Sequence, residues 1–192
     1  VDAGKYGEPG HADVLFNTPF TIIKSFETEK LTRLNYYPAS QLTQWCNPIH
    51  KADTSTFTGE NVVVIILESF GKEYTALSGK ESYTPFLDSL MQNSLVYTNA
   101  FANASKSIEG IPAILSAMPG LMENPYINSP YCNNTINSMA SLLKQKKYQT
   151  AFFHGGFNGT MNFDAYARGA GYDEYYGKNE YANDSDFDGA WG

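Results

Sequence analysis

The stretch that decides the fold is "NVVVIILESFGKEY", from Asn61 to Tyr74. Its apolar run, Val62 to Leu67, is rich in β-branched residues and does not alternate with polar ones. Such a run is typical of a strand buried on both faces of a parallel sheet, and it is too short to span a membrane. Glu68 would follow at the carboxyl end of the strand, where open α/β sheets bind ligands. We interpret Glu68 either as a ligand or base, or as a cap for the backbone amides that follow it.

Strand and helix patterns alternate from Glu60 onward. The predicted strands are Val62 to Leu67, "LVYTNAFAN" and "QTAFFHGG"; the predicted helices are "YTPFLDSLMQNS", "SIEGIPAILSAMPG" and "NTINSMASLLKQKKY". Thr84 and Pro85 are suited to the N-cap and first position of the first of these helices. This alternation predicts an α/β fold with a mostly parallel sheet.

The first region, residues 1–58, carries no strong chemical motif. We predict a helix from Thr18 to Phe26 and irregular chain over residues 34–60, which are rich in Thr, Ser, Pro and Asn. We expect this region to be an arm that packs against a domain formed by residues 59–192.

The composition restricts the possible partners. The chain has 192 residues and a net charge of -7, and its Lys and Arg residues are scattered, so we do not expect it to bind nucleic acid. No signal peptide or transmembrane segment is evident, and the first residues resemble the start of an excised or mature product. The two cysteines, Cys46 and Cys132, could form a disulfide in an oxidising compartment or remain thiols.

Polar residues follow all three predicted strands: Glu68, the loop "NASKS" that ends at Ser107, and His154. Parallel strands share one carboxyl edge, so these residues are expected to converge there. Ser107 opens a helix, where free amides and the helix dipole favour a phosphoryl or sulfuryl group; alternatively it is only the N-cap. No His adjoins Ser107, so metal coordination is the expected way to activate it, with Glu68 as a ligand. His154 is a candidate to bind a substrate oxygen.

Four segments together carry a family resemblance: "NVVVIILESFGKEY", "TPFLDSL", "ANASKSIEGIPAILSAMP" and "TAFFHGGFNGTMNFDAYARGAGYDEYYG". As a set they resemble the sulfatase-like branch of the alkaline phosphatase superfamily, and most of all the lipoteichoic acid synthase and membrane phosphoglycerol transferase family of bacteria. The resemblance implies a three-layer α/β sandwich with a mostly parallel sheet. Residues 59–192 would be its N-terminal portion, incomplete at the C-terminus, and residues 1–58 would link it to a membrane region absent here.

The resemblance also implies roles for the candidate residues. Glu68 would be a metal ligand, Ser107 the nucleophile and a second metal ligand, and His154 a contact to the head group of the substrate. The metal would be manganese, with magnesium or zinc as alternatives. Met161 and Phe163 stand where lipoteichoic acid synthase has a Trp and a phosphate-binding Arg, so the substrate stays open.

The implied function is metal-dependent phosphotransfer, similar to that of phosphoglycerol transferases, on lipid-linked head groups through a covalent phospho-Ser intermediate. The protein would belong to the bacterial cell membrane, with its catalytic domain on the periplasmic or cell-surface side and a phospholipid head group as substrate. The alternatives are a phosphoethanolamine transferase, another sulfatase-fold phosphodiesterase or hydrolase, or a binding module without turnover. Sulfate-ester cleavage is disfavoured because "IEGIP" after Ser107 does not fit the family's C/S-x-P-x-R motif. The Asp-His pair that completes the family's metal site is missing here, so we expect this chain alone to be inactive and to bind metal weakly.

Overall fold

The computed structural model describes residues 19, 22–23, 31, 34–45, 56–181, 183 and 185. These residues fall into two compact units, one from Thr28 to Phe70 and one that combines Val1–Glu27 with Gly71–Gly192. Most of the helix predicted from Thr18 to Phe26 lies outside the described residues. No helix in the described part of the chain is long and apolar enough to cross a membrane.

In the described part of the unit from Thr28 to Phe70, one helix is present, α3, at Ala39–Trp45. The prediction of irregular chain over residues 34–60 is therefore wrong at this helix. The helix starts directly after Pro38, whose carbonyl accepts hydrogen bonds from the amides of Gln41 and Leu42. The Thr, Ser and Pro content of this region suggested a loop. Pro38 instead precedes the first turn of the helix, where the N–H that a proline lacks would have no partner within the helix.

The segment Val62–Leu67 forms neither a strand nor a helix and is not buried, which corrects the sequence-based prediction. Its side chains are 41% to 80% exposed, and its backbone pairs with no other strand of the described chain. The second predicted strand, "LVYTNAFAN", is also unpaired, with Leu95 and Phe101 exposed. The reason is that a strand needs a neighbouring backbone to satisfy its N–H and C=O groups, and an apolar pattern does not specify that neighbour.

The second unit holds the remaining helices and the sheet. The longer helices are α4 (Pro85–Met91), α5 (Ser107–Ser116), α6 (Met139–Lys144), α7 (Phe163–Gly169) and α8 (Lys178–Tyr181). Short 3-10 turns are η3 (Lys72–Tyr74), η4 (Ala76–Ser78), η5 (Tyr126–Asn128) and η6 (Thr160–Asn162). The predicted start of α4, with Thr84 as N-cap and Pro85 in the first turn, is confirmed.

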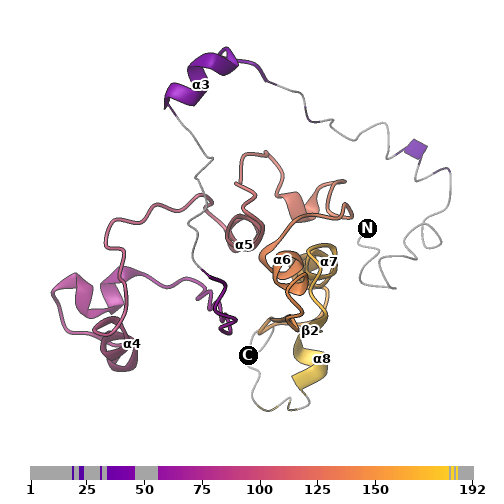
Figure 1. Cartoon of the computed structure of the whole chain (residues 1–192). Helices are drawn as coiled ribbons and strands as arrows, with labels where there is room; N and C mark the ends of the chain where they lie inside the picture. The colour runs from indigo at the N-terminus through magenta and orange to yellow at the C-terminus, as the bar shows by residue number, and fades with distance from the viewer. Residues whose placement is uncertain are drawn as a thin grey trace. The chain divides into compact units, whose positions relative to one another are not determined.

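The sheet pairs two parallel strands, β1 (Ala151–Phe153) and β2 (Glu174–Tyr176). β1 confirms the third predicted strand, whereas β2 lies in the tail where none was predicted. In the register of the pair, Phe152 lies opposite Tyr175. The α7 helix lies beside this pair (Figure 1). The fold is thus α/β with parallel pairing, as predicted.

A small apolar core joins α5, α7 and β1. It contains these buried residues: Ile108, Ile111, Leu115, Ile127, Phe152, Phe163, Tyr166, Ala167 and Ala170. The α5 residues in it recur at the three- to four-residue spacing of one helix face. Aromatic rings surround Phe152, with Tyr172 edge-on at 5.5 Å and Tyr175 stacked at 5.7 Å between ring centroids. This core fixes the first turn of α5 and the end of β1, where the candidate residues lie.

Candidate active site

Ser107 is the first residue of α5, and the N-cap position belongs to Lys106. The carbonyl of Lys106 accepts hydrogen bonds from the amides of Glu109 at 3.0 Å and Gly110 at 2.8 Å. The Ser107 hydroxyl makes no hydrogen bond with any described residue, so the interpretation of Ser107 as an N-cap is wrong. The amides of Ser107 and Ile108 also have no hydrogen-bond partner among the described residues, as expected for the first turn of a helix.

Ser107 therefore combines three properties of a nucleophile in phosphoryl transfer. The residue is half-buried, its hydroxyl has no hydrogen-bond partner among the described residues, and it lies beside backbone N–H groups at the positive end of a ten-residue helix. Such amides are suited to bind the oxygens of an anionic group.

His154 follows β1 directly, and its backbone amide donates to the carbonyl of Tyr176 at 2.9 Å. Its ring Nδ1 lies 3.0 Å from the hydroxyl oxygen of Tyr175. The edge of Phe163 meets the imidazole at 88°, with 4.9 Å between ring centroids. Burial lowers the pKa of His154, and the nearby Asp164 carboxylate partly opposes this shift. His154 is thus a half-buried imidazole held in a defined orientation.

Asp164 and Tyr175 were not predicted from the sequence. One Asp164 oxygen accepts a hydrogen bond from Arg168 at 3.1 Å, while its Oδ1 is buried and has no partner among the described residues. Burial raises the pKa of Tyr175, and the Asp164 charge raises it further. The signal that could have found Tyr175 is the aromatic run "EYY", which is typical of a strand, but its register with β1 could not be read from the sequence.

Glu68 lies in a turn of the other unit and is exposed. The hydroxyl of Ser69 donates to its carboxylate at 3.4 Å, and Ser69 has a left-handed φ of 51°. Glu68 is described within its own unit, so its predicted convergence with Ser107 and His154 stays a prediction. In the part of the chain that the structure describes, no group of three or more His, Cys, Asp or Glu side chains could hold a metal ion.

The cysteine prediction also stays open. Burial raises the pKa of the half-buried Cys132 thiol. Cys46, with which it could form a disulfide, lies outside the described residues.

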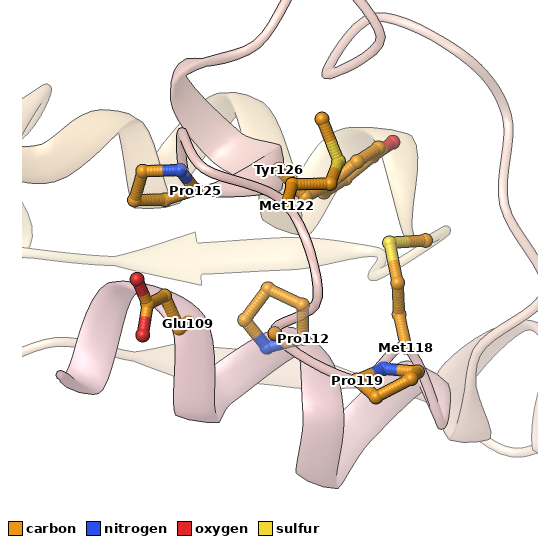
Figure 2. Close-up of a pocket in the computed structure, with 8 residues that line it drawn as sticks. Glu109, Pro112, Met118, Pro119, Met122, Pro125 and Tyr126 are labelled. Atoms are coloured by element: carbon orange, nitrogen blue, oxygen red, sulfur yellow. The ribbon is translucent and has the colours of Figure 1, made fainter. Parts of the chain in front are cut away.

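A hollow lies between α5 and the segment from Met118 to Tyr126. Its lining is formed by Glu109, Pro112, Met118, Pro119, Gly120, Met122, Pro125 and Tyr126. Figure 2 shows Glu109 and Pro112 on one side of it and Met122 and Tyr126 on the other. The lining is apolar apart from the Glu109 carboxylate and the tyrosine hydroxyl. Glu109, the first residue of the lining, is two residues after Ser107 in the sequence.

A sequence model of the Sulfatase family matches residues 60–191, which include Glu68, Ser107 and His154. The chain belongs to the sulfatase family. This membership, with the parallel strands and surrounding helices, confirms the predicted alkaline phosphatase and sulfatase-like fold class. The sulfatase fold is an enzyme fold, and members of the family typically use divalent metals.

Two solved structures resemble this sulfatase-family chain. One is the lipoteichoic acid synthase LtaP from Listeria monocytogenes, with 29% identity and a TM-score of 0.51, covering 57% of this chain and 27% of that one. The other is a protein of the alkaline phosphatase superfamily from Vibrio parahaemolyticus, with 30% identity and a TM-score of 0.54, covering 61% of this chain and 28% of that one. This chain therefore spans a little over a quarter of the length of the structures it resembles.

Proposed function

We propose that this sulfatase-family protein is a phosphotransferase that moves a glycerophosphoryl group from a lipid-linked donor, with Ser107 as the nucleophile. The observation that carries the proposal is the state of Ser107: a half-buried residue at the first position of α5, whose hydroxyl makes no hydrogen bond to any described residue. The similarity to a lipoteichoic acid synthase supports this class of substrate.

In the proposed step, Ser107 Oγ attacks the phosphorus of a phosphatidylglycerol-like donor. The bond formed joins Oγ to phosphorus, and the bond broken joins phosphorus to the oxygen of diacylglycerol. The proton lost by the serine ends on the released diacylglycerol. The free amides of Ser107 and Ile108 are suited to stabilise negative charge on the phosphoryl oxygens. An acceptor hydroxyl then displaces Ser107 and restores its hydroxyl.

His154 would bind an oxygen of the head group. Tyr175 and Phe163 hold the imidazole ring of His154. The ring nitrogens of His154 therefore have a fixed orientation. Fixed donors contribute more than mobile ones because they need no reorganisation during the reaction.

We further propose that the native protein uses a divalent metal, manganese first, with Glu68 and Ser107 among its ligands. When bound, such a cation lowers the pKa of a coordinated hydroxyl. Two ligands are fewer than the three that catalytic zinc sites take from the protein, and the described residues offer no cluster of three. The described residues therefore do not by themselves make a complete site. Because the chain is similar to a lipoteichoic acid synthase, we also propose that its catalytic domain works outside the cytoplasmic membrane.

Phosphoethanolamine transfer is the second candidate. The Glu109 carboxylate in the wall of the hollow near the start of α5 favours it, because a carboxylate attracts the ammonium of ethanolamine and not the neutral glycerol. Competition between the two donors in one assay separates the candidates. A binding module without turnover would process neither donor.

The test is the release of diacylglycerol from a fluorescent phosphatidylglycerol analogue by the native protein. Ser107→Ala should abolish release, and Ser107→Thr should keep substantial activity because it offers the same hydroxyl. Ser105→Ala is the matched control, since it removes an exposed side chain's hydroxyl two residues earlier, just before α5, and should leave release unchanged. Turnover by Ser107→Ala at close to the wild-type rate would show that another group is the nucleophile.

A further inference from the structure

We propose that Tyr175 is a positioning residue for His154: its hydroxyl donates a hydrogen bond to Nδ1 and holds the neutral imidazole in the tautomer that carries its proton on Nε2. The Nε2–H group is then the donor offered to an oxygen of an anionic substrate. The role of Nε2–H toward a substrate rests on the proposed function, in which His154 binds the head group. The hydrogen bond from Tyr175 and the tautomer it sets concern the chain alone and are tested without any substrate.

The backbone register brings the two side chains together. Tyr175 lies opposite Phe152 in the parallel pair, and His154 is two residues after Phe152. Side chains two residues apart in extended chain project from the same face of a sheet. The hydrogen bond from the His154 amide to the carbonyl of Tyr176 continues the ladder past the end of β1. The approach of Tyr175 to His154 is therefore set by backbone pairing.

The rings around the pair restrict both side chains. Phe152 stacks on Tyr175 with an interplanar angle of 12° and 5.7 Å between centroids. Phe163, itself only 2% exposed, meets the imidazole edge-on. With one ring packed on each partner, the 3.0 Å separation between the Tyr175 hydroxyl and Nδ1 is held by the core and does not depend on a mobile surface contact.

The direction of the hydrogen bond follows from the chemistry of the two groups. A phenol is a good donor and a weak acceptor, while the unprotonated nitrogen of a neutral imidazole is a good acceptor. Donation by Tyr175 to Nδ1 leaves the ring proton on Nε2, since the tautomer is set by the bond that the other nitrogen makes.

Burial keeps both groups in their neutral forms. It lowers the pKa of His154, against an opposing effect of Asp164. It also raises the pKa of Tyr175, as do the charges of Asp164 and Glu180, while Arg168 lowers it. The carboxylate of Asp164 is in turn bonded to Arg168, which weakens its pull on the imidazole. The neutral pair that the tautomer requires is therefore the favoured state near neutral pH.

The experiment is nitrogen NMR of the imidazole in the ¹⁵N-labelled 192-residue chain. The signals of His154 are assigned by their loss in His154→Gln. In the wild type, the coupling pattern should show the proton on Nε2 and an unprotonated Nδ1. In Tyr175→Phe, which keeps the ring and removes only the hydroxyl, the tautomers should mix and the pKa of His154 should rise, because the donor that favoured the neutral form is gone. Tyr176→Phe is the matched control, because its hydroxyl bonds to Glu174 and not to His154.

A proton on Nδ1 in the wild type would overturn the proposal, and this result needs no variant to fold. An unchanged tautomer in a folded Tyr175→Phe chain would also overturn it. In the native enzyme, Tyr175→Phe should raise KM for the donor lipid by about tenfold, with a smaller effect on kcat, because the hydroxyl acts through substrate binding. An unchanged KM alongside mixed tautomers would refute the role in binding. If the native enzyme transfers no head group while the tautomer is as proposed, the proposed function fails and the assignment of Tyr175 stands.

Discussion

Ser107 and Ser138 open two helices of the same unit, and the structure predicts opposite effects on stability when each becomes alanine. The Ser107 hydroxyl bonds to no described residue, and Ser107 is inside the helix rather than at its N-cap. Ala is favoured over Ser within helices by up to about 0.5 kcal/mol. Ser107→Ala should therefore change the free energy of unfolding by no more than about 0.5 kcal/mol, and toward greater stability.

Ser138 is the N-cap of α6, and its side chain is almost fully buried. Its hydroxyl accepts from the amide of Ser141 at 3.0 Å and donates to the carbonyl of Ala170. Losing the cap costs about 1 kcal/mol, and leaving the buried carbonyl unpaired costs about 1–3 kcal/mol more. Ser138→Ala should therefore destabilise the chain by about 2–4 kcal/mol.

Urea unfolding of the chain, followed by far-UV circular dichroism, measures both effects. The midpoint should rise slightly for Ser107→Ala and fall for Ser138→Ala, with the same slope in both, because neither change alters the surface exposed on unfolding. A loss of more than about 1 kcal/mol in Ser107→Ala would refute the reasoning, since it would mean that the hydroxyl supports the helix and is not reserved for chemistry.

The remaining predictions concern the core, a buried phenol and the metal. Phe152→Ala should cost about 3–5 kcal/mol because it empties the centre of the aromatic cluster, whereas Phe153→Ala, at a side chain that is 73% exposed, should cost under about 1 kcal/mol in the same urea assay. Burial raises the pKa of Tyr166 to about 12 from 10.0, so the folded state holds this proton more tightly and its stability should fall as pH rises from about 10 to about 12; Tyr166→Phe should remove that part of the fall. In the native protein, Glu68→Gln should lose bound manganese and transferase activity together. Metal analysis of the purified variant, beside its activity assay, checks this prediction, and loss of one without the other would contradict it.

Local signals in the sequence predicted the elements that depend on local chemistry. The Thr84–Pro85 start of α4 and the start of α5 at Ser107 are both present. The strand before His154 is present too, although it also needs its partner β2. The two helix starts depend on residues within a few positions, such as an N-cap residue or a proline in the first turn. The helix predicted in "NTINSMASLLKQKKY" is also present but shorter, because the capping box at Ser138 sets its start.

Elements that depend on a distant partner were not predictable in the same way. The run Val62–Leu67 has the composition of a buried strand but is exposed and unpaired in the described chain. β2 pairs with β1, yet its sequence gave no sign of a partner more than twenty residues earlier. Tyr175 was missed for the same reason, because its contact with His154 depends on the register between β1 and β2.

Phe163 lies at a position for which the family resemblance implies a different residue. The resemblance implies a phosphate-binding Arg at this point, and this chain instead has a buried Phe that packs against His154 and Phe152. A guanidinium there would be a buried charge without a partner, so Phe163→Arg should destabilise the fold rather than add a phosphate contact. Any phosphate contact beyond those proposed for His154 and the α5 amides would have to come from other residues.

The central claim is that Ser107 carries the transferred group. The most direct measurement is mass spectrometry of the native protein after rapid acid quenching during turnover of a phosphatidylglycerol donor with manganese. The account predicts a glycerophosphoryl adduct on the peptide that contains Ser107, absent from Ser107→Ala and present in Ser105→Ala. Release of diacylglycerol with no adduct on Ser107, or with the adduct on another residue, would contradict it.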